Sequence, residues 1–135
     1  MHVFTYGSLM FPAVWRRVVR GSHRSLPAVL DGYARHAVRG ELYPGIVHRP
    51  GASVEGVLYL DVNEAELAVL DGFEGCEYRR ESVMVRTAHD MQMVAADAYL
   101  FLAGHRLSGE AWEPQHFRMA HFIAAHCGGT GETTV

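Results

Sequence analysis

Two short segments far apart in the chain carry residue types that suit chemistry on a small acidic molecule. Near the start, Tyr6, Gly7, Ser8 and Leu9 follow a run of strand-forming residues. A strand that turns through glycine presents backbone N–H groups that can bind a carboxylate. In the middle of the chain, Glu74 stands between two glycines at the end of a predicted helix. An anion-binding turn and a single carboxylate together indicate proton-transfer chemistry.

Both segments also have simpler interpretations. From the local sequence alone, Glu74 is equally well explained as a surface residue at a frayed helix end. Ser8 suggests a nucleophile, but the Gly-x-Ser-x-Gly elbow is missing, because neither of its flanking glycines is present and Met10 stands at the second position. A hydrolase that uses Ser8 or a cysteine is therefore a weak alternative, and we expect Ser8 to donate a hydrogen bond or to cap the following turn.

Composition limits the classes of protein to consider. A chain of 135 residues that is 49% hydrophobic fits a single domain over residues 1–135. The formal charge of -3 argues against a nucleic-acid-binding protein. The arginines near the start are expected on a solvated helix face; they are Arg16, Arg17, Arg20 and Arg24.

All 12 basic residues are arginine, because the chain contains no lysine. Schiff-base catalysis, lysine-anchored pyridoxal phosphate and P-loop chemistry are thereby excluded. The start of the chain lacks the pattern of a signal peptide, and no apolar stretch is long enough to cross a bilayer, so we expect a cytoplasmic protein that does not bind membranes. The sequence does not predict an oligomeric state.

No metal site is predicted. Cys76 and Cys127 lack the spacing of a zinc or redox motif. His116, His121 and His126 recur every five residues, which places successive side chains about 140° apart on a helix and off a common face.

Apolar alternation, punctuated by glycine and proline, predicts short strands with three helical segments. We expect strands at 2–6, 26–30, 33–39, 45–49, 53–60, 82–87 and 94–102.

The helices have recognisable start and stop signals. The first begins near Pro12 and closes at Gly21. The second spans 64–71, with Asn63 as the cap and Glu66 completing a capping box. The last begins at Pro114 and ends at the glycines 128–129, leaving 130–135 as a frayed tail. This order of elements does not alternate as in a doubly wound sheet, so we expect an α+β fold with a strongly curved or closed sheet.

Several segments of the chain together resemble a known family, the gamma-glutamylcyclotransferase-like proteins. The resemblance covers about residues 3–123 and is nearest to the short branch, which includes gamma-glutamylamine cyclotransferases and plant homologues. It is carried by Phe4-Thr5-Tyr6-Gly7-Ser8-Leu9, Gly40-Glu41-Leu42-Tyr43-Pro44, Val54-Glu55-Gly56-Val57-Leu58-Tyr59, Leu70-Asp71-Gly72-Phe73-Glu74-Gly75 and Glu77-Tyr78-Arg79-Arg80.

The resemblance implies a small mixed β-barrel flanked by two or three short helices, with the active site at one mouth. It also implies a reaction: the α-amine of a γ-glutamyl group attacks its own γ-carbonyl, which forms 5-oxoproline and releases the attached amine or amino acid. This chemistry uses no cofactor.

The demands of that reaction match the residues already singled out. The substrate α-carboxylate is expected at Tyr6, Gly7, Ser8 and Leu9, bound mostly by backbone groups. Glu74 is expected to accept a proton from the α-ammonium and to deliver one to the leaving amine, with its pKa raised by burial beside Phe73.

Further substrate contacts follow from the resemblance. It suggests that Tyr43 forms part of another wall of the substrate pocket, although Tyr-Pro-Gly is also a common turn. It suggests an aromatic hydroxyl on a late strand, at Tyr99 or, in another register, at Phe101, which has no hydroxyl. Arg80 is more simply explained as a structural ion pair or an exposed strand residue.

Two readings of function remain. The first is a cyclotransferase, whose leaving amine (amino acid, glutathione, polyamine or lysine conjugate) the sequence does not identify. The second is a non-catalytic module that binds or senses glutamyl-type ligands.

Overall fold

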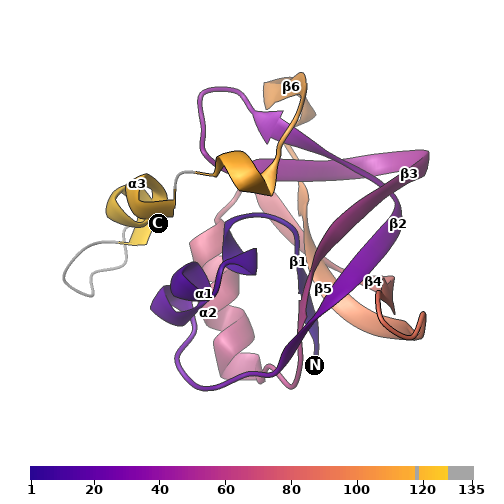
Figure 1. The fold of residues 1–135 in the computed structure, drawn as a ribbon. Coiled ribbons are helices and arrows are strands. Elements are labelled where there is room, and N and C mark those ends of the chain that lie inside the picture. Colours follow the sequence, from indigo (N-terminus) through magenta and orange to yellow (C-terminus); the bar gives the residue numbers. More distant parts are fainter. Residues whose placement is uncertain (118, 128–135) are drawn as a thin grey trace.

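The computed structural model describes residues 1–117 and 119–127, and its central feature is a closed β-barrel (Figure 1). The barrel strands are β1 (Val3–Thr5), β2 (Ser25–Val38), β3 (Pro44–Tyr59), β4 (Tyr78–Thr87) and β5 (Met93–Phe101). Hydrogen bonding runs in the order β3-β1-β5-β4-β2, and a β2–β3 pairing closes the ring. The β1–β5 pair is parallel and the other pairs are antiparallel. The predicted α+β fold with a closed mixed barrel is confirmed.

Short helices and turns surround the barrel. They are η1 (Ser8–Met10), α1 (Pro12–Val18), α2 (Glu64–Glu74), η2 (Gly104–Arg106), η3 (Pro114–His116), α3 (Met119–Phe122) and the π-helical turn η4 (Ile123–Cys127). Helices α1 and α2 lie side by side on one flank of the barrel (Figure 1). In the described part of the chain, no helix has the length and apolar character needed to cross a bilayer.

Strands β2 and β3 are each longer than predicted, because two expected breaks are bends within continuous strands. The pairing register shifts between Asp31 and Tyr33. At the bend, Gly32 has φ 85° and Gly51 has φ 86°, conformations that glycine adopts without strain. The sequence predicted separate strands at 26–30 and 33–39, and at 45–49 and 53–60; this was wrong because glycine here marks a bulge.

Helix α2 begins as predicted and ends later. The Asn63 side chain accepts from the Glu66 N–H at 2.8 Å, and the Glu66 carboxylate accepts from the Asn63 N–H at 2.9 Å, so the predicted capping box is present. The helix continues past the predicted end at residue 71 to Glu74, and Gly75 follows with φ 79°. The side chain of Glu74 is therefore held by the last helical turn.

Three other elements differ from the prediction. Strand β4 begins at Tyr78 instead of residue 82, because the charged residues 79–81 also pair with β5. A further strand, β6 (Leu107–Ala111), was missed; it pairs with β2 at two positions and its sequence has little β propensity. The single helix expected from Pro114 is interrupted at Phe117, which has extended φ and ψ. The expected stop at 128–129 and the tail at 130–135 lie outside the described residues.

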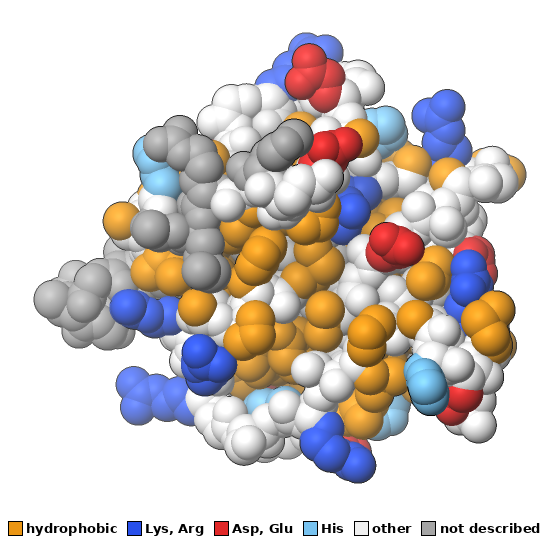
Figure 2. All heavy atoms as spheres, in the orientation of Figure 1, with side chains coloured by type: hydrophobic (Ala, Val, Ile, Leu, Met, Phe, Trp, Pro, Cys, Tyr) orange, Lys and Arg blue, Asp and Glu red, His pale blue; other side chains and the backbone are white. Residues whose placement is uncertain are grey.

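Apolar side chains form two buried clusters. One lies between the barrel and the helices and includes Trp15, Tyr59, Leu70 and Phe122. Figure 2 shows hydrophobic side chains gathered near the middle of one face, with most of the charged side chains around its edge. The Trp15 and Tyr59 rings stack with centroids 3.7 Å apart, and the Tyr59 hydroxyl donates to the Leu9 carbonyl at 2.9 Å. This packing fixes the segment that follows β1.

Candidate active site

A cavity opens where the end of β1 meets the last turn of α2. The space between atoms, its open mouth included, is ≈ 350 Å³. The cavity is lined by Phe4, Thr5, Tyr6, Gly7, Ser8, Leu9, Tyr43, Pro44, Glu74, Tyr78 and Tyr99. Every site residue expected from the sequence is in this lining.

The loop from β1 into η1 leaves backbone donors at the cavity wall. The Gly7 and Ser8 carbonyls accept from the N–H groups of Met10 at 3.0 Å and Phe11 at 3.2 Å. The N–H groups of Gly7, Ser8 and Leu9 donate to no backbone carbonyl among the described residues. Such N–H groups at the start of a helical turn are available to an anion.

Gly7 is required by its neighbour. A Cβ added to Gly7 would lie 2.8 Å from Cδ of Pro44, closer than real side chains pack. Any larger residue would displace either the loop or the start of β3. The glycine therefore sets how closely the backbone donors approach the opposite wall.

Glu74, half-buried at the end of α2, supplies the carboxyl group in the lining of the cavity. Its carboxyl group makes no hydrogen bond or ion pair with any residue in the ranges 1–117 and 119–127. Burial raises the pKa of Glu74 to about 8, since no partner compensates for the loss of water around the carboxylate. A carboxyl group in this range exchanges protons readily near neutral pH.

The tyrosine hydroxyls around the cavity are already used by the protein. The Tyr6 hydroxyl donates to the Tyr99 carbonyl at 2.6 Å, and the Tyr78 hydroxyl donates to the Pro44 carbonyl at 2.7 Å. The Tyr99 hydroxyl donates to Oδ1 of Asp71 at 2.6 Å. Burial raises the pKa of all three tyrosines. These side chains shape the cavity in their neutral form.

Two polar side chains in the lining differ from the tyrosines. The Ser8 hydroxyl and the Glu74 carboxyl have no hydrogen-bond partner among the residues described. Neither belongs to the fully buried side-chain atoms without a partner, so both are open to water or to a ligand in the cavity. Ser8 and Glu74 are therefore the side chains that the cavity offers to a ligand.

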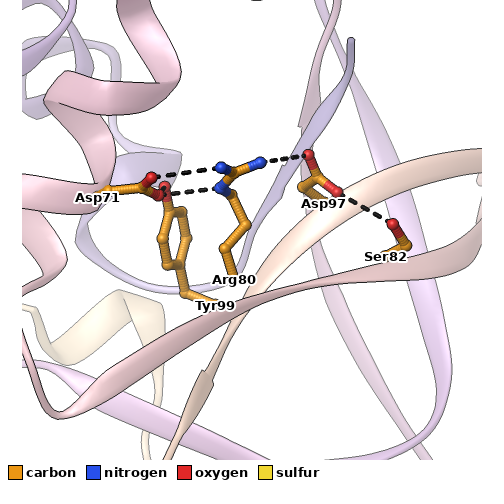
Figure 3. A network of polar contacts seen from close by, with 5 residues as sticks. All are labelled: Asp71, Arg80, Ser82, Asp97 and Tyr99. Atoms are coloured by element: carbon orange, nitrogen blue, oxygen red, sulfur yellow. Dashed lines mark hydrogen bonds and ion pairs between the residues drawn. The ribbon is translucent and has the colours of Figure 1, made fainter. Parts of the chain in front are cut away.

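A polar network holds the last turn of α2 against the barrel (Figure 3). Arg80 on β4 donates to both carboxylate oxygens of Asp71, from Nε at 2.9 Å and from Nη2 at 3.3 Å. Its Nη1 donates to Asp97 on β5 at 3.2 Å, and Ser82 also donates to Asp97 at 3.4 Å. Partial burial opposes ionisation of Asp71, but the hydrogen bonds from Tyr99 and Arg80 outweigh it and lower its pKa.

The two candidate aromatic residues on β5, Tyr99 and Phe101, have different surroundings. Tyr99 lines the cavity, whereas Phe101 packs edge to face on Tyr78, with ring centroids 5.2 Å apart, outside the lining. The Tyr99 hydroxyl reaches Asp71, which precedes Glu74 by one helical turn. Sequence reasoning assigned no role to Asp71 or Tyr78; the signal available for Asp71 was its i, i+3 spacing from Glu74.

Tyr43 forms part of the cavity wall beside a cluster of charges. Arg106 donates to Glu77, and to Glu41 at 3.1 Å. Burial is the main cause of the raised pKa of Tyr43, and the carboxylates of Glu41 and Glu77 add to it.

No group of three or more metal-ligating side chains gathers in the portion of the chain that is described.

Comparisons with known proteins identify the family of this chain. A family model described as gamma-glutamyl cyclotransferase, AIG2-like, matches residues 3–116. Protein AIG2 C of Arabidopsis thaliana is 34% identical over 122 residues, which make up 89% of this chain and 73% of that protein.

Solved structures share the fold. An Arabidopsis thaliana protein solved in solution is 32% identical, with a TM-score of 0.73 over 92% of this chain and 76% of its own. A structure named gamma-glutamyl cyclotransferase is 22% identical, with a TM-score of 0.64 over 74% of this chain and 65% of its own, and is similar in fold. The chain belongs to the gamma-glutamyl cyclotransferase, AIG2-like family.

Proposed function

We propose that this protein is a cyclotransferase that converts a γ-glutamyl amine or γ-glutamyl amino acid into 5-oxoproline and the free amine. The observation that carries the proposal is a single cavity that holds two groups: the Glu74 carboxyl, which has no partner among the described residues, and the N–H groups of Gly7, Ser8 and Leu9, which bond to no described backbone carbonyl. One wall can bind the charged end of a glutamyl group, and the other can move protons.

The substrate α-carboxylate is assigned to the loop after β1. Backbone N–H groups favour an anion without bringing a competing positive charge near the substrate ammonium. The Ser8 hydroxyl adds a donor that the protein does not use elsewhere in the described chain. Bound in this way, the glutamyl chain extends toward Glu74.

Ring closure follows from holding one conformer of the substrate. The amine and the γ-carbonyl belong to the same molecule, and a well-oriented intramolecular reaction gains up to about 7–11 kcal/mol from effective molarity. The cavity therefore needs to fold the glutamyl chain and to exclude other conformers.

Glu74 accounts for the protons. Its carboxylate takes one proton from the α-ammonium, and the free amine then attacks the γ-carbonyl to form a C–N bond. Glu74 passes that proton to the leaving nitrogen as the old C–N bond breaks, takes the second proton from the ring nitrogen, and releases it to the departing amine or to water. A carboxyl pKa of about 8 suits both accepting and donating a proton.

The test is a substrate panel. Purified protein is incubated with γ-glutamyl conjugates of amino acids, simple amines, polyamines and the lysine side chain, and with glutathione, and 5-oxoproline is measured. Each substrate is matched by its α-N-acetyl derivative, which cannot cyclise. We expect stoichiometric 5-oxoproline and amine from at least one free conjugate and none from the acetylated controls.

The alternative is a non-catalytic binding module for glutamyl-type ligands. It predicts saturable binding of 5-oxoproline with no product from any conjugate in the panel. That result would replace the proposed enzyme by this second function.

A further inference from the structure

Arg35 on β2 holds the loop that contains Gly7, Ser8 and Leu9. Its Nη1 donates to the Tyr6 carbonyl at 2.8 Å and to the Glu55 carbonyl at 3.1 Å. The guanidinium carbon lies 5.3 Å from the centroid of the Trp112 ring, a cation–π arrangement. The two hydrogens on one nitrogen therefore tie the end of β1 to β3, and the indole supports the guanidinium group.

The position of this hydrogen bond sets the direction of the next N–H group. The peptide bond between Tyr6 and Gly7 is trans and planar, so its C=O and N–H point in opposite directions. Arg35 is not in the lining of the cavity; with Met10 and Phe11 it lines a separate groove. Because the carbonyl is held toward Arg35, the Gly7 N–H is directed away from that groove.

The charge of Arg35 also strengthens that donor. A hydrogen bond from a charged group is stronger than a neutral one, and it polarises the peptide unit that accepts it. The Gly7 N–H at the other end becomes a better donor to an anion. Arg35 acts in this way without reaching the ligand.

We propose that Arg35 is a positioning residue, which orients and polarises the Tyr6–Gly7 peptide so that the Gly7 N–H binds the substrate α-carboxylate. This inference rests on the proposed function, because it assigns that carboxylate to the loop after β1. It goes further in naming a residue from a distant strand that determines selectivity for ligands with a carboxylate.

The test compares two ligands that differ only in the carboxylate. The wild-type protein and the variants Arg35→Met and Arg35→Lys are titrated by NMR with 5-oxoproline and with 2-pyrrolidinone, which lacks the carboxylate. Methionine keeps the aliphatic stem but removes the charge, and lysine keeps the charge without the planar fork.

We expect R35M to bind 5-oxoproline about tenfold more weakly, equivalent to 1.4 kcal/mol, and 2-pyrrolidinone with unchanged affinity. R35K should fall between R35M and wild type. The matched control is Arg86→Met, since Arg86 pairs with Asp31 at the surface of the barrel and does not line the cavity. R86M should bind both ligands as wild type does.

Two results would overturn the inference: unchanged 5-oxoproline binding in R35M and R35K, or an equal loss of affinity for both ligands, which indicates general damage. The substrate panel distinguishes a failure of the Arg35 role from a failure of the proposed catalysis. If wild type releases 5-oxoproline and neither variant changes the KM, only the role of Arg35 fails. If wild type releases none but binds 5-oxoproline in an Arg35-dependent way, only the proposed catalysis fails.

Discussion

The Tyr99 hydroxyl donates to Asp71 Oδ1 over 2.6 Å and joins a central barrel strand to the last turn of α2. Glu74 lies on that same turn, three residues after Asp71. The position of the proposed acid/base group is thus fixed by contacts that its own carboxyl does not make. Rigid support from neighbouring groups is what allows a catalytic side chain to stay unpaired.

The first prediction concerns Asp71. Asp71→Asn weakens the contacts to Arg80 and Tyr99, and we expect kcat to fall by about ten- to a hundredfold, because small displacements of a catalytic group are costly. The free energy of unfolding should fall by only about 1 kcal/mol, since the ion pair is partly exposed. Steady-state kinetics and urea unfolding measure the two effects.

Asp31 offers the matched control for this variant. It accepts from Arg86 at 2.8 and 3.2 Å in the same two-point geometry, away from the cavity. Asp31→Asn should keep the wild-type kcat, because the pair that it weakens does not touch α2. Equal losses of kcat in D31N and D71N would contradict a positioning role for Asp71.

The second prediction concerns Gly7. In Gly7→Ala the new Cβ meets the Pro44 ring, so the loop moves and its N–H groups lose their alignment. We expect the KM for a γ-glutamyl substrate to rise by about tenfold or more, as binding of the carboxylate weakens. Steady-state kinetics with the best panel substrate provides the measurement.

Gly72 is the control for this substitution. It lies inside α2, and a Cβ there meets nothing within 4 Å. Gly72→Ala should keep the wild-type KM and stabilise the protein by about 0.5–1 kcal/mol, because alanine favours a helix interior. A wild-type KM in G7A would show that the loop does not bind the substrate.

The third prediction is a pH dependence of stability. The folded-state pKa of Glu74 is about 8, above the ordinary glutamate value of 4.5, because burial disfavours the carboxylate. The folded state therefore holds more protons than the unfolded state between these two values. Its contribution to stability is full below the unfolded pKa and is lost as the pH rises through the folded pKa.

Urea unfolding of wild type and Glu74→Gln measures this effect. The stability of wild type relative to E74Q should fall by about 3 kcal/mol between pH 5 and pH 8. A difference that stays constant over this range would mean that the Glu74 carboxyl is hydrated in the folded protein.

Local signals in the sequence predicted much of the fold. The capping box of Asn63 and Glu66, the proline at the start of α1 and the β-branched runs each depend on neighbouring residues alone. The long strands β2 and β3 could not be predicted in the same way. Gly32 and Gly51 resemble strand ends in the sequence, and only the pairing of β2 with β3 shows that they lie at a bend within each strand. Strand β6 is stabilised by pairing with β2, which its own composition does not indicate.

In the candidate site, too, residues in short motifs could be predicted from the sequence, and contacts between distant residues could not. Tyr6 to Leu9 and Glu74 belong to short motifs, whose residue types indicated that both act on one substrate, and both line the cavity. The hydrogen bond of Tyr99 to Asp71 spans 28 residues, and that of Arg35 to Tyr6 spans 29. Such supporting contacts depend on how the barrel closes, so local sequence patterns do not reveal them.

The most direct test of the central claim is the kcat of Glu74→Gln against that of Glu64→Gln for 5-oxoproline release. Both changes remove one carboxylate from α2, but Glu64 is exposed in the first turn and does not line the cavity. We predict a loss of about 10²- to 10⁴-fold in E74Q and wild-type turnover in E64Q. Turnover in E74Q within a few-fold of wild type would contradict it.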